Sequence, residues 1–460
     1  MRQQALEYAR THQDEALNGL IELLRIPSIS ALPAHQPDIH RAAQWLVDRL
    51  TAIGLENARI IPTDGHPLVY ADWLHAAGAP TLLVYGHYDV QPVDPLDEWH
   101  TPPFEPTIQG DKLYARGADD NKGQFFAHVA AVEAYLKSAG QLPVNLKFIL
   151  EGEEEVGSPN LDKFIQHNQD LLRADALLIS DTPMADPDTP VVVTGVRGLV
   201  YTEIFMQGPR RDLHSGAYGG AVHNPLNALV KVLAALHDEQ GRVTVPGFYD
   251  DVQELTPAER EAINAGPLTE ESVLAETGAP ALWGEPGYTV AERLSVRPTL
   301  DIHGIKGGFI GEGGKTVIPA KASAKVSMRL VPHQDPHKIA RQFADYVRRL
   351  SPPTVTVEVV THAAADSAVV DIADPAVQAA GTACELAFGR RPLFQREGGT
   401  LPIVATFGKV LGAPVVMMGL GLPDDNIHAP NERFHLPNFY RGIEAAIHYY
   451  DIFSTVAPRR

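Results

Sequence analysis

Cysteine is nearly absent from this sequence of 460 residues, which contains Cys384 and no other. A single cysteine cannot form a disulfide within the chain, and it cannot build a thiolate zinc site. Any metal that this protein binds must therefore be held by oxygen and imidazole ligands.

Basic residues are scarce relative to acidic ones, because 38 lysines and arginines stand against 57 aspartates and glutamates. The net charge of −19 repels phosphate backbones and anionic lipids, so we expect no nucleic-acid partner and no membrane partner. Long apolar runs of about 18 residues are also missing, and the charged start of the chain lacks the apolar core of a signal peptide. The expected location is therefore the cytoplasm.

The composition is otherwise that of a globular protein, since apolar residues make up 44% of the chain. Its length exceeds what one hydrophobic core usually serves, so two domains are expected. Short apolar runs bounded by turn residues predict buried strands at 81–85, 144–150 and 176–180, with a helix at 123–137. Strands that alternate with helices favour an α/β sheet covered by helices.

The sequence pattern changes near Thr194. Half-buried strands are predicted at 200–206 and 325–330, and the segment 246–300, rich in proline, glycine and acidic residues, is expected to be irregular. The helix–strand alternation returns from about Ala365. We therefore predict one domain interrupted by another. Further helices are expected at 17–24, 41–53, 225–236, 375–388 and 439–453.

Polar motifs directly follow the three predicted strands of the first region. His87 and Asp89 follow the first strand, the run Glu153–Glu155 follows the second, and Asp181 follows the third. Ligands of open α/β sheets bind beyond the carboxyl ends of the strands, so these side chains are expected to share one crevice. A further acidic pair, Asp119-Asp120, precedes the helix predicted from residue 123.

Each of these motifs also has an ordinary structural interpretation. His87 could cap a turn, Asp119 or Asp120 could cap a helix, and Asp181 could begin a turn. Three adjacent glutamates, however, repel one another, and the positive charge of a bound metal would offset that repulsion. Asp89 lies two residues from His87, on the same side of an extended segment, where it can orient the imidazole toward a metal.

Nine short motifs follow one another across residues 83–433: YGHYDVQPV, LYARGADDNKG, ILEGEEEVGS, LISD, DLHSG, KTVIP, MRLVP, REGGTLP and IHAPNER. Together they resemble the two-zinc metallopeptidase family of carnosine dipeptidase, acetylornithine deacetylase, succinyl-diaminopimelate desuccinylase and carboxypeptidase G. The resemblance is greatest to the cytosolic carnosine-type dipeptidases. H-E-x-x-H and G-x-S-x-G motifs, which mark other hydrolase mechanisms, are absent.

The resemblance implies an α/β fold of the zinc-peptidase type. Residues 1–194 and 365–460 would form the catalytic domain, with a central mixed sheet flanked by helices. Residues 195–364 would form a smaller α+β lid domain, which interrupts the catalytic domain and carries the contact of a homodimer.

The resemblance also implies two divalent metal ions in each subunit. His87 and Asp181 would hold one ion, Glu155 and His428 would hold the other, and Asp120 would bridge them. Zinc is expected, although manganese and cobalt also suit a mixed set of histidines and carboxylates.

Three catalytic roles follow from the same resemblance. Glu154 would act as general base on a water activated by the two metals. Asp89 would orient His87. His214, in the DLHSG motif, would reach the oxyanion in the active site of the partner subunit.

Four further positions would contact the substrate. Arg329 would pair with its carboxylate, for which a guanidinium offers two parallel hydrogen bonds. Thr316 and Thr400 match other contact positions, as does His362 in a segment that is less similar.

The predicted function is metal-dependent hydrolysis of amide bonds in dipeptides or short peptides. An N-acyl amino acid deacylase with the same metal site but a different pocket is the first alternative. A catalytically inactive binding protein is the second, and it is disfavoured because all five ligand positions and the base position hold suitable residues.

Overall fold

The computed structural model describes residues 1–266 and 268–459, which divide into two compact units. Unit 1 comprises Met1–Thr194, Val370–Gln395 and Thr406–Arg460, and unit 2 comprises Gly195–Val369 and Arg396–Ala405. The chain thus leaves unit 1 a second time, over ten residues that begin within the strand Leu393–Glu397.

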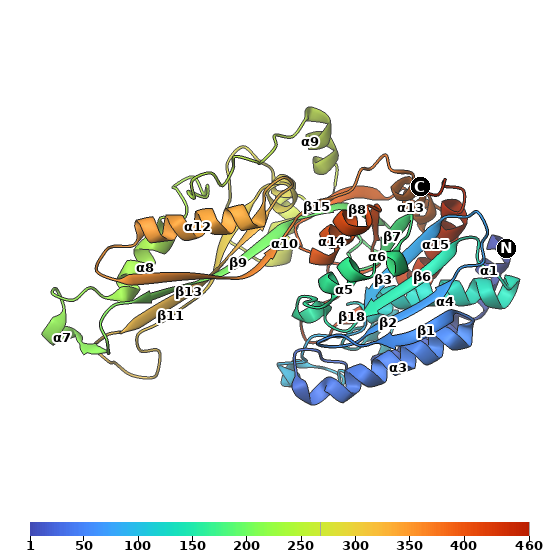
Figure 1. The fold of residues 1–460 in the computed structure, drawn as a ribbon, viewed down its shortest axis with the longest axis horizontal. Coiled ribbons are helices and arrows are strands. Elements are labelled where there is room, and N and C mark those ends of the chain that lie inside the picture. The colour runs from blue at the N-terminus through green and yellow to red at the C-terminus, as the bar shows by residue number, and fades with distance from the viewer. Residues whose placement is uncertain (267, 460) are drawn as a thin grey trace. The chain divides into compact units, whose positions relative to one another are not determined.

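A mixed sheet forms the centre of unit 1 (Figure 1). Its strands lie in the order β1-β2-β6-β3-β7-β17-β8-β15, and β16 pairs with β8. β3 is parallel to β6 and β7, and β7 is parallel to β17, whereas β2 is antiparallel to β1 and β6, and β8 is antiparallel to β15 and β17. The predicted α/β fold with a central mixed sheet is confirmed. The strands are β1 Glu56–Ile61, β2 Leu68–Trp73, β3 Thr81–His87, β6 Asn145–Glu151, β7 Ala176–Ile179, β8 Val191–Val196, β15 Ala368–Val369, β16 Leu393–Glu397 and β17 Val415–Met418.

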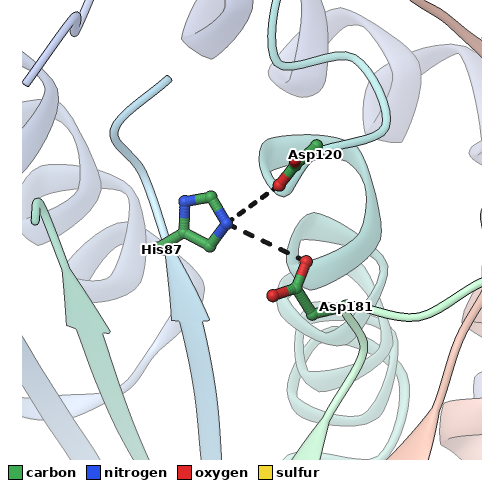
Figure 2. A group of neighbouring side chains, drawn as sticks. All are labelled: His87, Asp120 and Asp181. Atoms are coloured by element: carbon green, nitrogen blue, oxygen red, sulfur yellow. Dashed lines mark hydrogen bonds and ion pairs between the residues drawn. The ribbon is translucent and has the colours of Figure 1, made fainter. Parts of the chain in front are cut away.

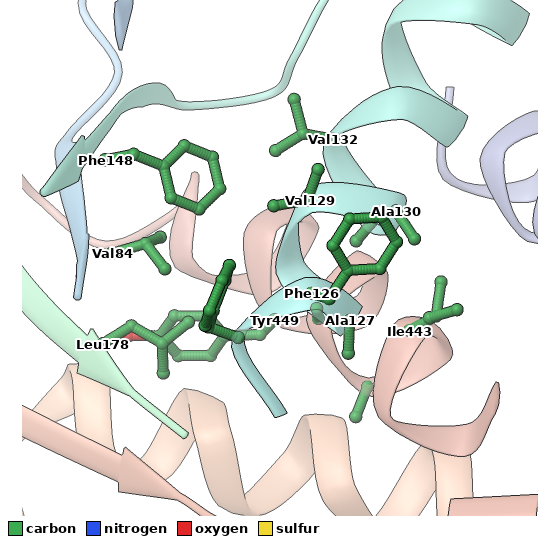
Figure 3. Close-up of a cluster of buried hydrophobic side chains, with 14 of the residues drawn as sticks. Val84, Phe126, Ala127, Val129, Ala130, Val132, Phe148, Leu178, Ile443 and Tyr449 are labelled. Atoms are coloured by element: carbon green, nitrogen blue, oxygen red, sulfur yellow. The ribbon is translucent and has the colours of Figure 1, made fainter. Parts of the chain in front are cut away.

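Helices cover this sheet, and the largest core lies between the sheet and α4 (Figure 3). Val84 and Phe148 of the sheet, Phe126 of α4 and Tyr449 of α15 are all fully buried there. On the other face, Phe407 of α14 packs edge-on against Tyr85. The helices are α1 Arg2–Thr11, α2 Gln13–Leu24, α3 Gln36–Ile53, α4 Lys122–Ala139, α5 Leu161–His167, α6 Gln169–Leu172, α13 Pro375–Phe388, α14 Pro402–Leu411 and α15 Leu436–Phe453, with single 3₁₀ turns η1 Pro33–His35, η2 Leu96–Glu98 and η3 Glu154–Val156.

Local sequence signals set several of these helix ends. Pro37 lies in the first turn of α3, where a missing N–H costs nothing, and Gly54 ends the helix with a φ of 108°. In unit 2, the helix α12 (Pro336–Leu350) begins with a proline, and Asp335 caps it by accepting hydrogen bonds from two backbone N–H groups.

Unit 2 is built on an antiparallel sheet in the order β11-β13-β9-β14. Residues of β9 alternate, so that Val200 and Ile204 are buried against α8 and α12 whereas Phe205 is exposed. The strands are β9 Gly198–Gln207, β11 Thr299–Gly307, β13 Lys321–Leu330 and β14 Thr356–Ala365, with a short pair β10 Leu213–His214 and β12 Val317–Ile318. The helices are α7 Ser215–Tyr218, α8 Pro225–Ala234, α9 Pro257–Asn264, α10 Glu270–Thr277, α11 Val290–Ser295 and α12 Pro336–Leu350.

The expectation that 246–300 is irregular was wrong in part, because α9, α10 and α11 lie within it. Thr269 and Thr289 form capping boxes that begin α10 and α11, and these polar caps stabilise helices that are only eight and six residues long.

A small sheet, β4 Thr107–Gln109, β5 Lys112–Tyr114 and β18 Arg433–His435, joins distant parts of unit 1. β18 pairs with β5, so the segment that precedes β18 is brought beside the segment that follows β5. None of the helices in the described part of the chain combines the length and the apolar character that crossing a bilayer requires.

Candidate metal centre

The ends of three parallel strands meet at one edge of the unit 1 sheet. His87 is the last residue of β3 and lies opposite Glu151, the last residue of β6. Asp181 comes two residues after the end of β7, which is parallel to β3. The convergence expected from the sequence is therefore observed for these strand ends.

The first group of possible metal ligands comprises His87, Asp120 and Asp181 (Figure 2). His87 Nε2 lies 3.0 Å from an Asp120 oxygen and 3.8 Å from an Asp181 oxygen. The His87 side chain is fully buried, and the other two are at most 15% exposed. Three donor atoms thus face one small volume inside the protein.

The second group comprises Asp120, Glu155 and His428. His428 Nε2 lies 2.9 Å from the other Asp120 oxygen and 3.2 Å from a Glu155 oxygen. The His428 side chain is 53% exposed, in contrast to His87. Asp120 therefore offers one oxygen to each group, as a bridging ligand would.

The electrostatics of the cluster show that it is short of positive charge. Burial raises the pKa of Asp181 well above its usual value, and nearby carboxylates add to that shift. The hydrogen bonds that the His428 ring donates to the Asp120 and Glu155 carboxylates raise its pKa to about 10. Divalent cations would relieve the same repulsion and would be bound by the same atoms. The residues present therefore fit two metal ions.

Glu154 and Asp89 lie beside the two groups. Burial raises the pKa of Glu154 to about 7, and Glu154 is not one of the residues that complete either group. Asp89 is fully buried; one oxygen lies 3.4 Å from His87 Nδ1, and its two oxygens accept hydrogen bonds from the N–H groups of Glu154 and Glu155. Asp89 thus links the histidine to the segment that carries the glutamates.

Asn121 makes a second link that the sequence did not predict. Its buried side chain accepts a hydrogen bond from the His87 N–H and donates to Asp181 Oδ1 at 2.8 Å. Gly86 permits this approach, because a Cβ there would lie 3.0 Å from Asn121 Oδ1 and 2.6 Å from Phe125 Cβ. The position of Asn121, directly after Asp120, was the only signal available in the sequence.

Two of the predicted substrate-contact residues, His214 and Thr316, lie close together in unit 2. His214 is on β10, and Thr316 directly precedes β12. His214 pairs with Val317, and the Ser215 N–H donates to the carbonyl of Thr316 at 3.2 Å. His214 Nδ1 accepts a hydrogen bond from the Gly216 N–H at 3.0 Å. In the neutral ring the proton is therefore on Nε2.

Two other predicted residues meet elsewhere in unit 2. Arg329 Nη1 donates to Thr400 Oγ1 at 2.6 Å, and Thr400 in turn donates to the carbonyl of Gly198. Arg329 has no carboxylate at ion-pair distance within the described ranges. His362 is not part of this pair, since it contacts Glu203 at 3.3 Å and the ring of Tyr201.

The model of one protein family matches residues 83–451, which is most of the chain and includes every residue of both ligand groups. The chain belongs to peptidase family M20/M25/M40. It is therefore a peptidase by family, and the resemblance seen in the short motifs is confirmed.

Several members of this family are similar to the chain over nearly its whole length. The Cys-Gly metallodipeptidase dug1 of Schizosaccharomyces pombe is 33% identical over 97% of both chains. The human Beta-Ala-His dipeptidase is 32% identical over 96% of this chain and 90% of its own. The solved structure of human carnosine dipeptidase 1 is 31% identical, covers 99% of both chains and has a TM-score of 0.86.

Proposed function

We propose that this protein is a metal-dependent dipeptidase whose centre holds two divalent ions, with zinc as the native metal. The observation that carries the proposal is the pair of ligand groups that share Asp120. Its family and the dipeptidase relatives support the substrate class. His87 and Asp181 would bind one ion, and Glu155 and His428 the other.

Bound divalent ions would supply Lewis acidity and lower the pKa of a coordinated water. Glu154 would accept a proton from the attacking water and deliver it to the departing amine nitrogen. Its pKa of about 7, raised by burial, suits both transfers near neutral pH. Asp89 would hold His87 in the orientation that turns Nε2 toward Asp120 and Asp181.

His214 would stabilise the oxyanion that forms when the peptide carbonyl is attacked. The Gly216 N–H occupies Nδ1, which leaves the Nε2–H as the donor that an oxyanion needs. Arg329 would bind the substrate carboxylate, and Thr400 would hold the guanidinium in place. Thr316 and His362 are proposed as further substrate contacts.

The geometry of unit 2 supports a homodimer in which His214 serves the partner's active site. Lys321, close to β12, and Arg329 are eight residues apart along β13, which corresponds to about 26 Å. An extended dipeptide spans about 7 Å. This separation along β13 is much longer than a dipeptide, which favours an arrangement in which His214 and Arg329 of one copy serve different active sites.

The remaining assignments follow from these roles. Residues 1–194 and 365–460 are proposed as the catalytic domain, and residues 195–364 as the lid and dimerisation domain. The cytoplasm is proposed as the location, because reducing conditions suit a chain whose single cysteine is buried and free.

The test is hydrolysis of a panel of dipeptides by the purified protein, run beside N-acetyl and N-succinyl amino acids. Chelation should abolish release of free amino acids, and adding back Zn²⁺ or Mn²⁺ should restore it. Cleavage of the acylated amino acids without cleavage of any dipeptide would replace this proposal with the deacylase function.

A further inference from the structure

Glu432 is a fully buried carboxylate that accepts four hydrogen bonds from one loop. One oxygen accepts from Arg116 Nη1 at 2.8 Å and from the Gly117 N–H at 2.9 Å. The other accepts from the N–H groups of Asp119 and Asp120, both at 3.1 Å. The backbone of the loop that ends in Asp120 is thus wrapped around a single side chain.

The same residue belongs to the loop that carries His428. Glu432 follows His428 by four residues, and its backbone carbonyl accepts a hydrogen bond from the Ala115 N–H at 3.2 Å. The loop itself is irregular, since His428 and Asn431 have φ values of 59° and 63°, in the left-handed region. No helix or strand therefore holds the half-exposed His428 ring in place.

We infer that Glu432 is a positioning residue that fixes Asp120 and His428 relative to each other before a metal binds. The inference rests on the proposed function, because it takes both residues as ligands. The third member of their group, Glu155, is held separately through Asp89 and through Gln91, whose amide donates to it at 2.7 Å. Beside the backbone pairing of β18 with β5, the Glu432 carboxylate supplies a side-chain link between the loop of Asp120 and the loop of His428.

The first group is less dependent on this carboxylate. Asn121 ties the Asp120 segment to His87 and Asp181 whether or not Glu432 is charged. A change at Glu432 should therefore lower the affinity for the ion that His428 binds more than the affinity for the other ion.

Glu432→Gln is the decisive substitution because it keeps the size and shape of the side chain. Both oxygens face N–H donors, so the new amide NH₂ opposes two donors whichever way the side chain is turned. Glu292→Gln is the matched control. Glu292 is fully buried in unit 2, pairs with Arg260 at 3.2 Å and accepts a hydrogen bond from the Thr289 N–H, yet contacts none of the proposed ligands.

The experiment is calorimetric titration of the metal-free full-length proteins with Zn²⁺ in the presence of a competing chelator. Wild type and Glu292→Gln should each bind two ions. The His428→Ala variant identifies which of the two binding steps depends on His428. In Glu432→Gln, the Zn²⁺ affinity of that step should fall about 10- to 100-fold, and the affinity of the other step should fall by less. Unchanged affinities, or equal falls in both, would overturn the positioning role. Fewer than two ions in wild type would instead overturn the proposed function, and this inference with it.

Hydrogen exchange of the wild-type protein gives a second test that does not depend on folding of the variant. The amides of Asp119 and Asp120 should be protected in the metal-free protein, because Glu432 already accepts from both. Amides that exchange freely until Zn²⁺ is added would show that the metal, and not Glu432, organises this loop.

Discussion

The two ligand groups differ in what holds them. His87 and Asp181 lie at or just after the ends of central strands, and the His87 side chain is completely buried. Glu155 lies in a 3₁₀ turn and His428 in an irregular loop, where its side chain is 53% exposed. A rigid sheet therefore positions one group, whereas hydrogen bonds between loops position the other. We expect the two proposed metal sites to differ in their response to mutation.

The largest effect is expected when the residue shared by both groups is removed. Asp120→Ala takes a ligand from each proposed ion, so both ions should be lost and hydrolysis should fall by about 10⁴-fold or more. Metal content and dipeptide hydrolysis measure the change. The neighbouring Asp119 belongs to neither group, so Asp119→Asn should keep both ions. An equal loss of metal in that variant would contradict the assignment of Asp120 as the shared ligand.

Glu154→Gln should remove catalysis without disturbing either group. The amide cannot accept the proton, so hydrolysis should fall about 10²- to 10⁴-fold while two ions remain bound. Glu153→Gln is the control, because Glu153 accepts hydrogen bonds from His66 and Asn160 and lies outside both groups. Substantial activity in Glu154→Gln would show that another residue is the base.

The difference between the two histidines can be measured directly. His428→Ala should lower the affinity for one ion about 100-fold, or about 3 kcal/mol. The free energy of unfolding of the metal-free variant should stay within about 0.5 kcal/mol of the wild-type value. His87→Ala should lower the affinity for the other ion. It should also lower the free energy of unfolding by about 1–3 kcal/mol, because it removes a buried side chain. Equal stability losses, measured by denaturant unfolding, would contradict the distinction between strand and loop.

The smallest effect is expected in unit 2, whose described residues belong to neither ligand group. Thr400→Val removes the oxygen that Arg329 Nη1 contacts, so the KM for dipeptides should rise about 10-fold while kcat and metal content stay the same. Thr382→Val, an exposed threonine of α13, provides the control. A fall in kcat without a change in KM would argue against a role in holding the substrate.

Three central strands of unit 1 could be predicted from the sequence because they are short apolar runs followed by polar motifs. The runs at 81–85, 144–150 and 176–180 correspond to β3, β6 and β7 within two residues at either end. β1 was missed, since its residues are polar or only partly buried and give no apolar run. β2, β8 and β17 were also missed, although all their residues are buried. Thr269 and Thr289 show that capping residues can begin helices where proline, glycine and acidic residues suggested none.

The candidate site was predictable to a similar degree. All five proposed ligands come together, because parallel strand ends and one loop before a helix bring them there. Asn121 and Glu432 were not singled out, because their partners are backbone groups and residues more than 30 positions away. Such contacts depend on tertiary structure, which periodicity and spacing do not encode. The roles of these residues stay predictions until the variants are made.

Anomalous diffraction from crystals of the Zn²⁺-loaded protein, recorded above and below the zinc edge, tests the two-metal centre most directly. Two peaks are predicted, one beside His87 and Asp181 and one beside Glu155 and His428, with Asp120 between them. A single peak, or peaks bound by other residues, would contradict the proposed centre.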